Sequence, residues 1–171
     1  MAYMNSRPLT LRVAALFGAA LLAVNVSAQI PLKHSDKTFI EKATKSGREE
    51  VDISRIALER TSNADVKSFA KMLVAEHGAA NETLAVIATN KAVSLPAKDL
   101  ESSEKWLKKS GKNFDEDYLE KMISAHKDAV QLFEEQANEG QDTETKAFAR
   151  ATLPKLQHHL QKAMDLKKTL R

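Results

Sequence analysis

Three histidines and one glutamate have the residue types and the spacing of a transition-metal site. His77, His126 and His159 fall on the apolar stripes of three predicted helices, and Glu50 lies beside the stripe of a fourth. Three imidazole nitrogens and one carboxylate oxygen are a donor set that suits zinc or copper. The sequence contains no cysteine, which excludes thiolate ligands, disulfides and covalently attached haem c. One hypothesis is therefore a metal site at these four residues.

A carboxylate-bridged di-iron site is not expected, because its ligand pattern is missing. Such a site uses Glu-x-x-His on two helices, since residues at i and i+3 project toward the same ion. No Glu-x-x-His occurs anywhere in the sequence. Glu76 adjoins His77 but points about 100° away around a helix, so it is not expected to share a metal with that residue. We expect neither a di-iron oxidase nor a ferritin-type iron store.

The same histidines also fit a purely structural interpretation. A buried histidine commonly donates to a neighbouring carboxylate, amide or carbonyl, and it then fixes the register of its helix. A methionine such as Met122 could join a histidine on a non-covalent haem, but methionine at helical spacing is ordinary core filling. The chain has neither a serine on a strand–turn elbow nor a Gly-rich phosphate loop. The structural interpretation predicts no cofactor and no enzyme, whereas the alternative predicts a transition metal.

The elements that must position these residues are four long helices. Gly and Pro are scarce after Pro31, and apolar residues recur at helical spacing rather than in strand-like alternation. Helices are predicted from about Asp36 to Arg60, and from the cap Asn63 to about Asn90. Two more are predicted over residues 115–138 and from the cap Asp142 to about residue 169. The sequence therefore indicates an all-α bundle.

An internal repeat relates the two halves of the chain. At an offset of 79 residues, "DKTFIEK" (36–42) matches "DEDYLEK" (115–121), and the cap Asn63 matches the cap Asp142. The bundle is therefore predicted to consist of two related helical hairpins. The turn of the first hairpin near residues 62–63 places Gly78 opposite Gly47, with His77 near mid-height. The repeat puts His126 and His159 near the same level.

Residues 91–114 separate the two hairpins. Two dozen residues far exceed the usual connection between antiparallel helices. Leu95-Pro96 and Ser110-Gly111 break this segment, and the piece between them is predicted to form a short helix carrying Trp106. Such a crossover can run back along the bundle, so that the second hairpin starts at the opposite end, as in ferritin-like folds. An up-down-up-down bundle with a long loop is the alternative.

The first 28 residues have the pattern of a secretory signal peptide. Arg7 and Arg12 precede a short apolar run that ends in Val26-Ser27-Ala28, which predicts cleavage after Ala28 and export to the periplasm. An uncleaved N-terminal anchor is the alternative. Residues 29–35 are then a linker and residues 36–171 the bundle domain. Without the two arginines, 24 basic residues face 23 acidic ones, so the charge balance does not favour a nucleic-acid partner.

Several blocks of the chain resemble a known bacterial family. They are "FIEKATKSGREEVDISRIALERTSNADVKSFAKMLVAEHGAANETL" (39–84), "SGKNFDEDYLEKMISAHKDAVQLFEE" (110–135) and "KAFARATLPKLQHHLQKAMDL" (146–166). With the signal peptide, these blocks resemble the domain-of-unknown-function family DUF4142. The resemblance implies an exported, ferritin-like helical protein, often described in the family as an outer membrane protein. It implies no activity.

These observations lead to a prediction of a non-enzymatic binding or structural module of the bacterial envelope. Its partner would be a small ligand or an envelope protein, and peripheral association with the membrane is compatible with the family resemblance. The sequence does not specify an oligomeric state. The alternative function is a metal-binding protein that uses His77, His126, His159 and Glu50.

Overall fold

The computed structural model describes residues 31–109 and 113–170, and the predicted signal peptide lies outside them. This part of the chain forms helices and contains no strand, which confirms the all-α class. Four of the helices are long and one is short, and the predicted bounds of the long ones agree with the structure within two residues. The helices are α1 (His34–Arg60), α2 (Ala64–Asn90), α3 (Leu100–Lys108), α4 (Phe114–Glu139) and α5 (Thr143–Thr169).

Two predicted N-caps begin the second helix of each hairpin. The side chain of Asn63 accepts hydrogen bonds from the backbone amides of Asp65 and Val66 at the start of α2. Asp142 accepts from Glu144 and Thr145 in the same way at the start of α5. Each cap satisfies amides that have no partner inside the helix, so it fixes where the turn ends and the helix begins.

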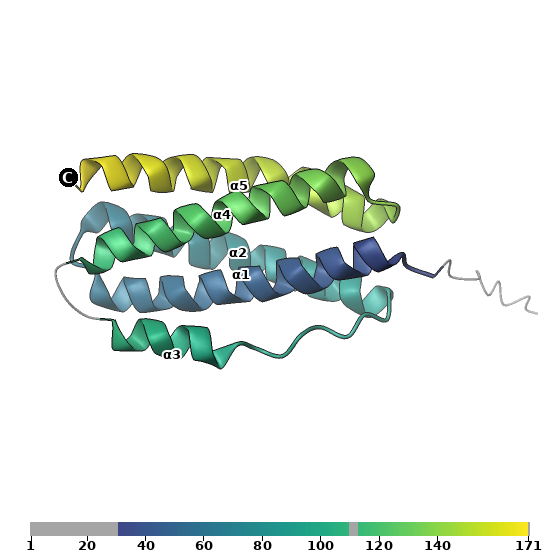
Figure 1. Cartoon of the computed structure of the whole chain (residues 1–171), viewed down its shortest axis with the longest axis horizontal. Coiled ribbons are helices and arrows are strands. Elements are labelled where there is room, and N and C mark those ends of the chain that lie inside the picture. Colours follow the sequence, from purple (N-terminus) through teal and green to yellow (C-terminus); the bar gives the residue numbers. More distant parts are fainter. Residues whose placement is uncertain (1–30, 110–112, 171) are drawn as a thin grey trace, which may run out of the picture. The chain divides into compact units, whose positions relative to one another are not determined.

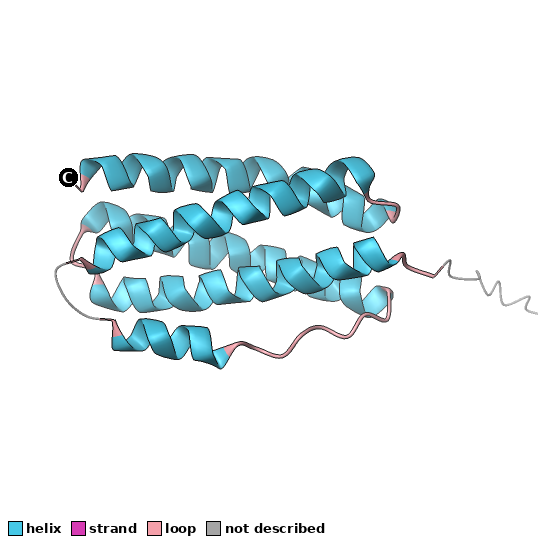
Figure 2. Ribbon diagram, viewed as in Figure 1, coloured by secondary structure: helices cyan, strands magenta, loops and turns pink. Residues whose placement is uncertain are grey.

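The crossover runs back along the bundle beside α1 (Figures 1 and 2). At one end of the bundle, Lys91 after α2 pairs with Asp142 at a nitrogen–oxygen distance of 2.6 Å. At the other end, Arg60 of α1 donates to the carbonyls of Leu107 and Lys109 at the end of α3. Helix α4 therefore starts at the end where α2 also starts, and each of the four long helices contributes one side to the interior.

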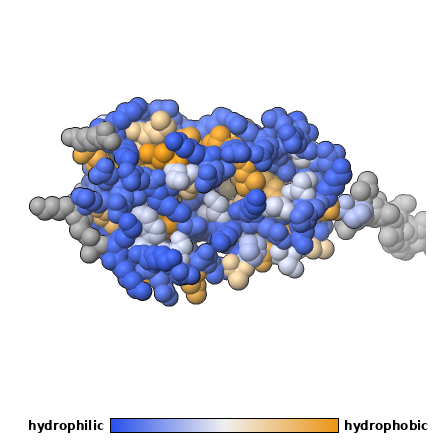
Figure 3. Space-filling model, in the orientation of Figure 1, coloured by the Kyte–Doolittle hydropathy of each residue, from blue (hydrophilic) through white to orange (hydrophobic). Residues whose placement is uncertain are grey.

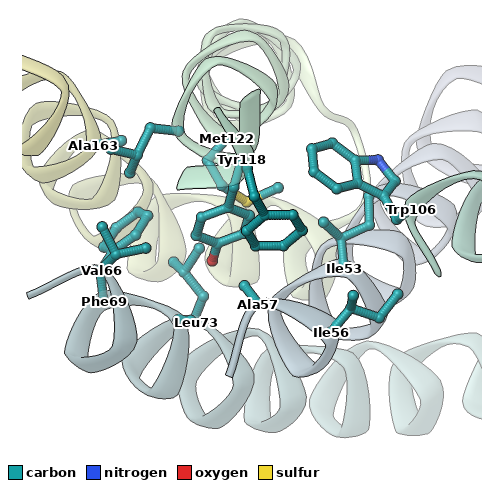
Figure 4. Packing of buried hydrophobic residues seen from close by; sticks show 13 residues of the cluster. Ile53, Ile56, Ala57, Val66, Phe69, Leu73, Trp106, Tyr118, Met122 and Ala163 are labelled. Atoms are coloured by element: carbon teal, nitrogen blue, oxygen red, sulfur yellow. The ribbon is translucent and has the colours of Figure 1, made fainter. Parts of the chain in front are cut away.

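The apolar interior consists of two clusters, one toward each end of the bundle. Figure 4 shows the first cluster, in which Trp106 of α3 covers the interior beside Ile53 and Tyr118. The second cluster gathers around the edge-to-face rings of Phe39 and Phe133, whose centroids are 5.0 Å apart. The two clusters leave a layer near the middle of the bundle in which the buried side chains are polar.

Hydrophilic residues cover most of the face seen in Figure 3, and hydrophobic residues show there in separate patches. Within residues 31–109 and 113–170, no helix combines the length and the apolar character needed to cross a bilayer.

Candidate metal centre

One imidazole from each of three helices meets at the middle of the bundle. His77 of α2, His126 of α4 and His159 of α5 have ring centroids 5.2 to 5.3 Å apart. One ring nitrogen of each lies within 4.8 Å of the corresponding nitrogens of the other two. All three side chains are buried. The structure thus brings together the three histidines that the sequence singles out.

Glu50 reaches the same point from α1, and only 2 % of it is exposed. Its Oε2 atom lies 3.3 Å from His77 Nε2 and 3.4 Å from His126 Nδ1. Neither approach is aligned as a hydrogen bond, and Oε2 accepts none from the part of the chain that the structure describes. The other oxygen, Oε1, accepts from the Ser46 hydroxyl at 2.9 Å. One buried carboxylate oxygen is therefore left among imidazole nitrogens without a hydrogen-bond donor.

The four side chains form a polar layer between the two apolar clusters. Along α2, His77 lies between Leu73 of the first cluster and Leu84 of the second. Along α5, His159 lies between Leu156 and Ala163 in the same way. Apolar side chains on both sides keep the local dielectric low, which strengthens any electrostatic interaction inside the layer and makes an unpaired charge costly.

Hydrogen bonds outside the cluster fix which ring nitrogens can bind an ion. His126 Nδ1 donates to the carbonyl of Met122 at 2.8 Å, so its Nε2 is unprotonated and accepts from His77 Nε2 at 3.2 Å. His159 Nε2 lies 3.2 Å from Glu76 Oε2 and donates to it. The remaining nitrogen, His159 Nδ1, is buried without a hydrogen-bond partner among the described residues. Both arrangements are those of histidine ligands whose second nitrogen is held by an outer acceptor.

Two of the donor–donor distances match those around a four-coordinate ion. A tetrahedral ion with bonds of about 2.1 Å holds its ligand atoms about 3.4 Å apart. His77 Nε2 and His126 Nε2 are 3.2 Å apart, and His77 Nε2 and Glu50 Oε2 are 3.3 Å apart. A nitrogen of His159 lies within 4.8 Å of a nitrogen of each of the other two histidines.

A comparison with protein-family models shows to which family the chain belongs. The family model described as "Domain of unknown function (DUF4142)" matches residues 22–166. The chain belongs to the DUF4142 family. No curated protein matches it.

Three solved structures resemble this DUF4142 protein, all at low sequence identity. A DUF305 fragment from Deinococcus radiodurans has a TM-score of 0.71 at 14% identity and covers 82% of this chain and 99% of its own. CopM in the Cu(I)-bound form has a TM-score of 0.67 at 16% identity, covering 79% and 96%. A dodecameric thioferritin, the bacterioferritin-related protein from Bacteroides fragilis, has a TM-score of 0.59 at 20% identity, covering 82% and 89%. These similarities establish a shared helical fold.

Burial changes the charge state of the polar layer in this DUF4142 protein. Loss of solvation and, to a smaller extent, the neighbouring His126 lower the pKa of His77 to about 3. Burial also lowers the pKa of His159 to about 4. Burial raises the pKa of Glu50, against the opposing effects of His126 and the Ser46 hydrogen bond. At neutral pH, His77 and His159 are therefore uncharged, each with one unprotonated ring nitrogen, and they supply no positive charge to the Glu50 carboxylate.

The sequence analysis missed the role of Glu76, which holds one of the three histidines. It lies outside the cluster, as expected from its direction around α2, but it contacts His159 across the interface with α5. Its side chain is 36% exposed, whereas His159 is 2% exposed. The feature of the sequence that could have indicated this contact was the position of Glu76 next to His77, on the side of α2 that faces another helix. The partner could not be named, because the rotation of α5 about its axis was unknown.

The predicted pairing of Gly78 with Gly47 is wrong. A β-carbon on Gly47 would lie 2.4 Å from the Asn81 side-chain oxygen, so the amide of Asn81 occupies the space that Gly47 leaves. A β-carbon on Gly78 would meet nothing within 4 Å. A cavity of about 30 Å³ lies beside this contact and is lined by Glu50, His77 and Asn81, among others. Asn81, one turn beyond His77, takes the position opposite Gly47 because helix rotation, and not only height, decides which residues face each other.

Proposed function

We propose that this DUF4142 protein is a non-enzymatic binding protein that holds one transition-metal ion between His77, His126, His159 and Glu50. The observation that carries the proposal is the Glu50 Oε2 atom, which is buried, accepts no hydrogen bond in the described chain and lies 3.3 Å from His77 Nε2, at the spacing of two ligand atoms. A cation at this point would compensate the carboxylate and bind the unprotonated ring nitrogens of His126 and His159.

A purely structural polar layer accounts less well for this geometry. Polar groups retained to fix helix register are normally satisfied, because an unpaired buried group costs about 1–3 kcal/mol. Two ring nitrogens, His126 Nδ1 and His159 Nε2, do have acceptors outside the cluster. Five buried side-chain polar atoms of the described residues have no hydrogen-bond partner, and two of them, Glu50 Oε2 and His159 Nδ1, belong to the layer. Outer ring nitrogens held by acceptors, together with inward atoms of Glu50 and His159 that have no partner, are the pattern of a ligand set.

The donor set favours Zn²⁺ or copper and binding over catalysis. Three neutral imidazoles and one carboxylate suit these ions, and four protein ligands leave a tetrahedral ion no open position for a substrate. CopM, which has a similar fold, was solved in a Cu(I)-bound form, and this supports copper as one candidate. A di-iron centre is not proposed, because Glu50 is the one carboxylate within the cluster formed by the described residues.

The location proposed for this binding protein is the periplasm, after cleavage behind Ala28. The support is the N-terminal pattern of residues 1–28 together with membership of DUF4142. In that compartment the metal would be exchanged with another envelope component, either a small chelating ligand or a protein partner. Peripheral association with the membrane is compatible with this role.

Metal titration of protein purified without a histidine tag, from cells that express the full chain, tests the proposal. After chelator treatment, calorimetry with Zn²⁺ and with Cu²⁺ is expected to give about one equivalent bound. His77→Ala should abolish this binding. His158→Ala is the matched control, because His158 adjoins the cluster in sequence but is exposed. Binding of less than about a tenth of an equivalent by the wild type, or equal losses in both variants, would sink the proposal.

A further inference from the structure

Two surface grooves lead from solvent toward the buried cluster. One lies between α2 and α5, has a volume of about 220 Å³, and includes Glu76, His77 and His159 in its lining. The other lies between α1 and α4, has a volume of about 380 Å³, and includes Glu49, Glu50 and Lys121. Both grooves touch ligands of the candidate centre, so the route by which an ion would be exchanged must be decided from the side chains that line each one.

The α1–α4 groove is crossed by an ion pair. Lys121 Nζ lies 2.8 Å from Glu49 Oε1, and Glu49 also accepts a hydrogen bond from Ser102 of α3 at 2.7 Å. Its carboxylate is therefore already engaged by two partners. A cation that approaches Glu50 from this side would meet a lysine ammonium and the Ser46 hydroxyl that is bound to the Glu50 carboxylate. Repulsion by the ammonium opposes passage of a second positive charge.

The α2–α5 groove instead offers metal-binding groups from its surface to its floor. The Glu76 carboxylate is 36% exposed, and its oxygen lies 3.2 Å from Nε2 of the nearly buried His159. The imidazole of His159 thus has one nitrogen bound to the groove residue and another, Nδ1, buried without a partner. Lys155 also lines this groove, but it is exposed, and its ammonium is free to extend into solvent. Metal-binding groups therefore follow one another from solvent to the cluster, first the Glu76 carboxylate and then the imidazole of His159.

We infer that the metal ion enters and leaves through the α2–α5 groove, and that Glu76 is the residue that first holds it. This inference rests on the proposed function. The carboxylate of Glu76 takes the ion in exchange for its hydrogen bond with His159. The freed imidazole then rotates and passes the ion inward to His77, His126 and Glu50. Glu76 is therefore a transfer residue for metal exchange and not a ligand of the final centre.

The kinetics of Zn²⁺ exchange distinguish transfer from simple orientation of His159. Glu76→Gln keeps an oxygen that accepts the His159 hydrogen bond but removes the anionic ligand. A transfer role predicts that the rates of Zn²⁺ loading and of Zn²⁺ release both fall by about tenfold, with Kd changed by less than about threefold. An orientation role alone predicts an unchanged loading rate and a faster release. Glu76→Asp is expected to recover part of the exchange rate.

The measurement is stopped-flow mixing of tag-free protein, purified from cells expressing the full chain, with Zn²⁺ and a zinc-sensitive chromophore. Glu49→Gln is the matched control in the other groove, and circular dichroism verifies the fold of each variant. Slower loading in Glu76→Gln alone supports the inference. An unchanged rate in Glu76→Gln, or slower loading in Glu49→Gln instead, overturns it while wild-type binding leaves the proposed function intact. Absence of Zn²⁺ uptake by the wild type overturns both.

Discussion

The Nε2 atoms of His77 and His126 lie 3.2 Å apart in the interior of the bundle, although the two residues are 49 positions apart in the sequence. One of these nitrogens must carry a proton in the metal-free protein. Because His126 already donates from Nδ1 to the Met122 carbonyl, the proton lies on His77 Nε2. Metal binding therefore requires His77 to move its proton to Nδ1, and the imidazole remains neutral throughout.

Proton release on metal binding is expected to come from Glu50. The pKa values of His77 and His159 are lowered to about 3 and about 4, so above pH 5 both are already neutral and release no proton. The pKa of Glu50 is raised by burial, so the metal displaces a proton from this carboxyl whenever the pH lies below that raised pKa. Calorimetry in buffers of different ionisation enthalpy should show release of up to about one proton that diminishes as the pH rises. Release that is unchanged in Glu50→Gln would assign the proton to another group.

Glu50→Gln is expected to separate metal affinity from the stability of the metal-free protein. The amide keeps an oxygen for the Ser46 hydroxyl but removes a buried carboxyl whose Oε2 has no donor. At pH 8 the metal-free variant should be about 1–3 kcal/mol more stable toward urea than the wild type, while its affinity for Zn²⁺ falls by at least about 100-fold. Loss of stability together with unchanged Zn²⁺ affinity would show that Glu50 serves the fold alone.

The sequence predicted the helices and the common height of the histidines from local patterns and residue counting, and it left open whether the three side chains meet. Asn63 and Asp142 cap their helices through amides two and three residues away, so a short pattern suffices to locate the helix starts. The height of each histidine follows from the turn position and from the repeat. The position of a residue along the bundle axis can be found by counting residues from the turn, because each helical residue advances by a fixed rise.

The contacts that the sequence could not predict depend on the rotation of one helix relative to another. Glu76 reaches His159 across 83 positions, and Gly47 meets Asn81 rather than Gly78. Rotation is set by how many side chains pack together at once, and no single spacing encodes it. The candidate ligands could therefore be named in advance, whereas the residue that holds the outer nitrogen of His159 could not.

The metal-free protein is expected to lose stability in mild acid because of His77. Its folded-state pKa of about 3 lies below the ordinary value of 6.5, so between these values the unfolded chain binds a proton that the folded chain does not. Stability contributed by the neutral imidazole is complete above pH 6.5 and falls, as the pH drops toward 3, by up to about 1.4 kcal/mol per pH unit. Urea unfolding between pH 7 and 4.5 should show a shallower slope in His77→Gln than in the wild type. The exposed-site variant His158→Ala should keep the wild-type slope, and equal slopes in all three proteins would contradict the role of His77.

Asp36 is expected to be the polar residue on which the end of the bundle most depends. It is fully buried, and its Oδ1 accepts from Gln136 Nε2 at 2.7 Å and from the Gln141 amide at 3.1 Å. Its Oδ2 accepts from the Asp142 amide at 3.2 Å, so a single carboxylate joins the start of α1 to the turn between α4 and α5.

Asp36→Ala leaves three donors without this acceptor and should lower the free energy of unfolding by about 3 kcal/mol. Asp36→Asn retains one acceptor oxygen and should cost less, and the exposed Asp128→Ala should remain within about 0.5 kcal/mol of the wild type. Urea denaturation of the three variants measures these differences, and an Asp36→Ala loss no larger than that of Asp128→Ala would mean that the turn is held by the Asp142 cap and the Lys91–Asp142 pair alone.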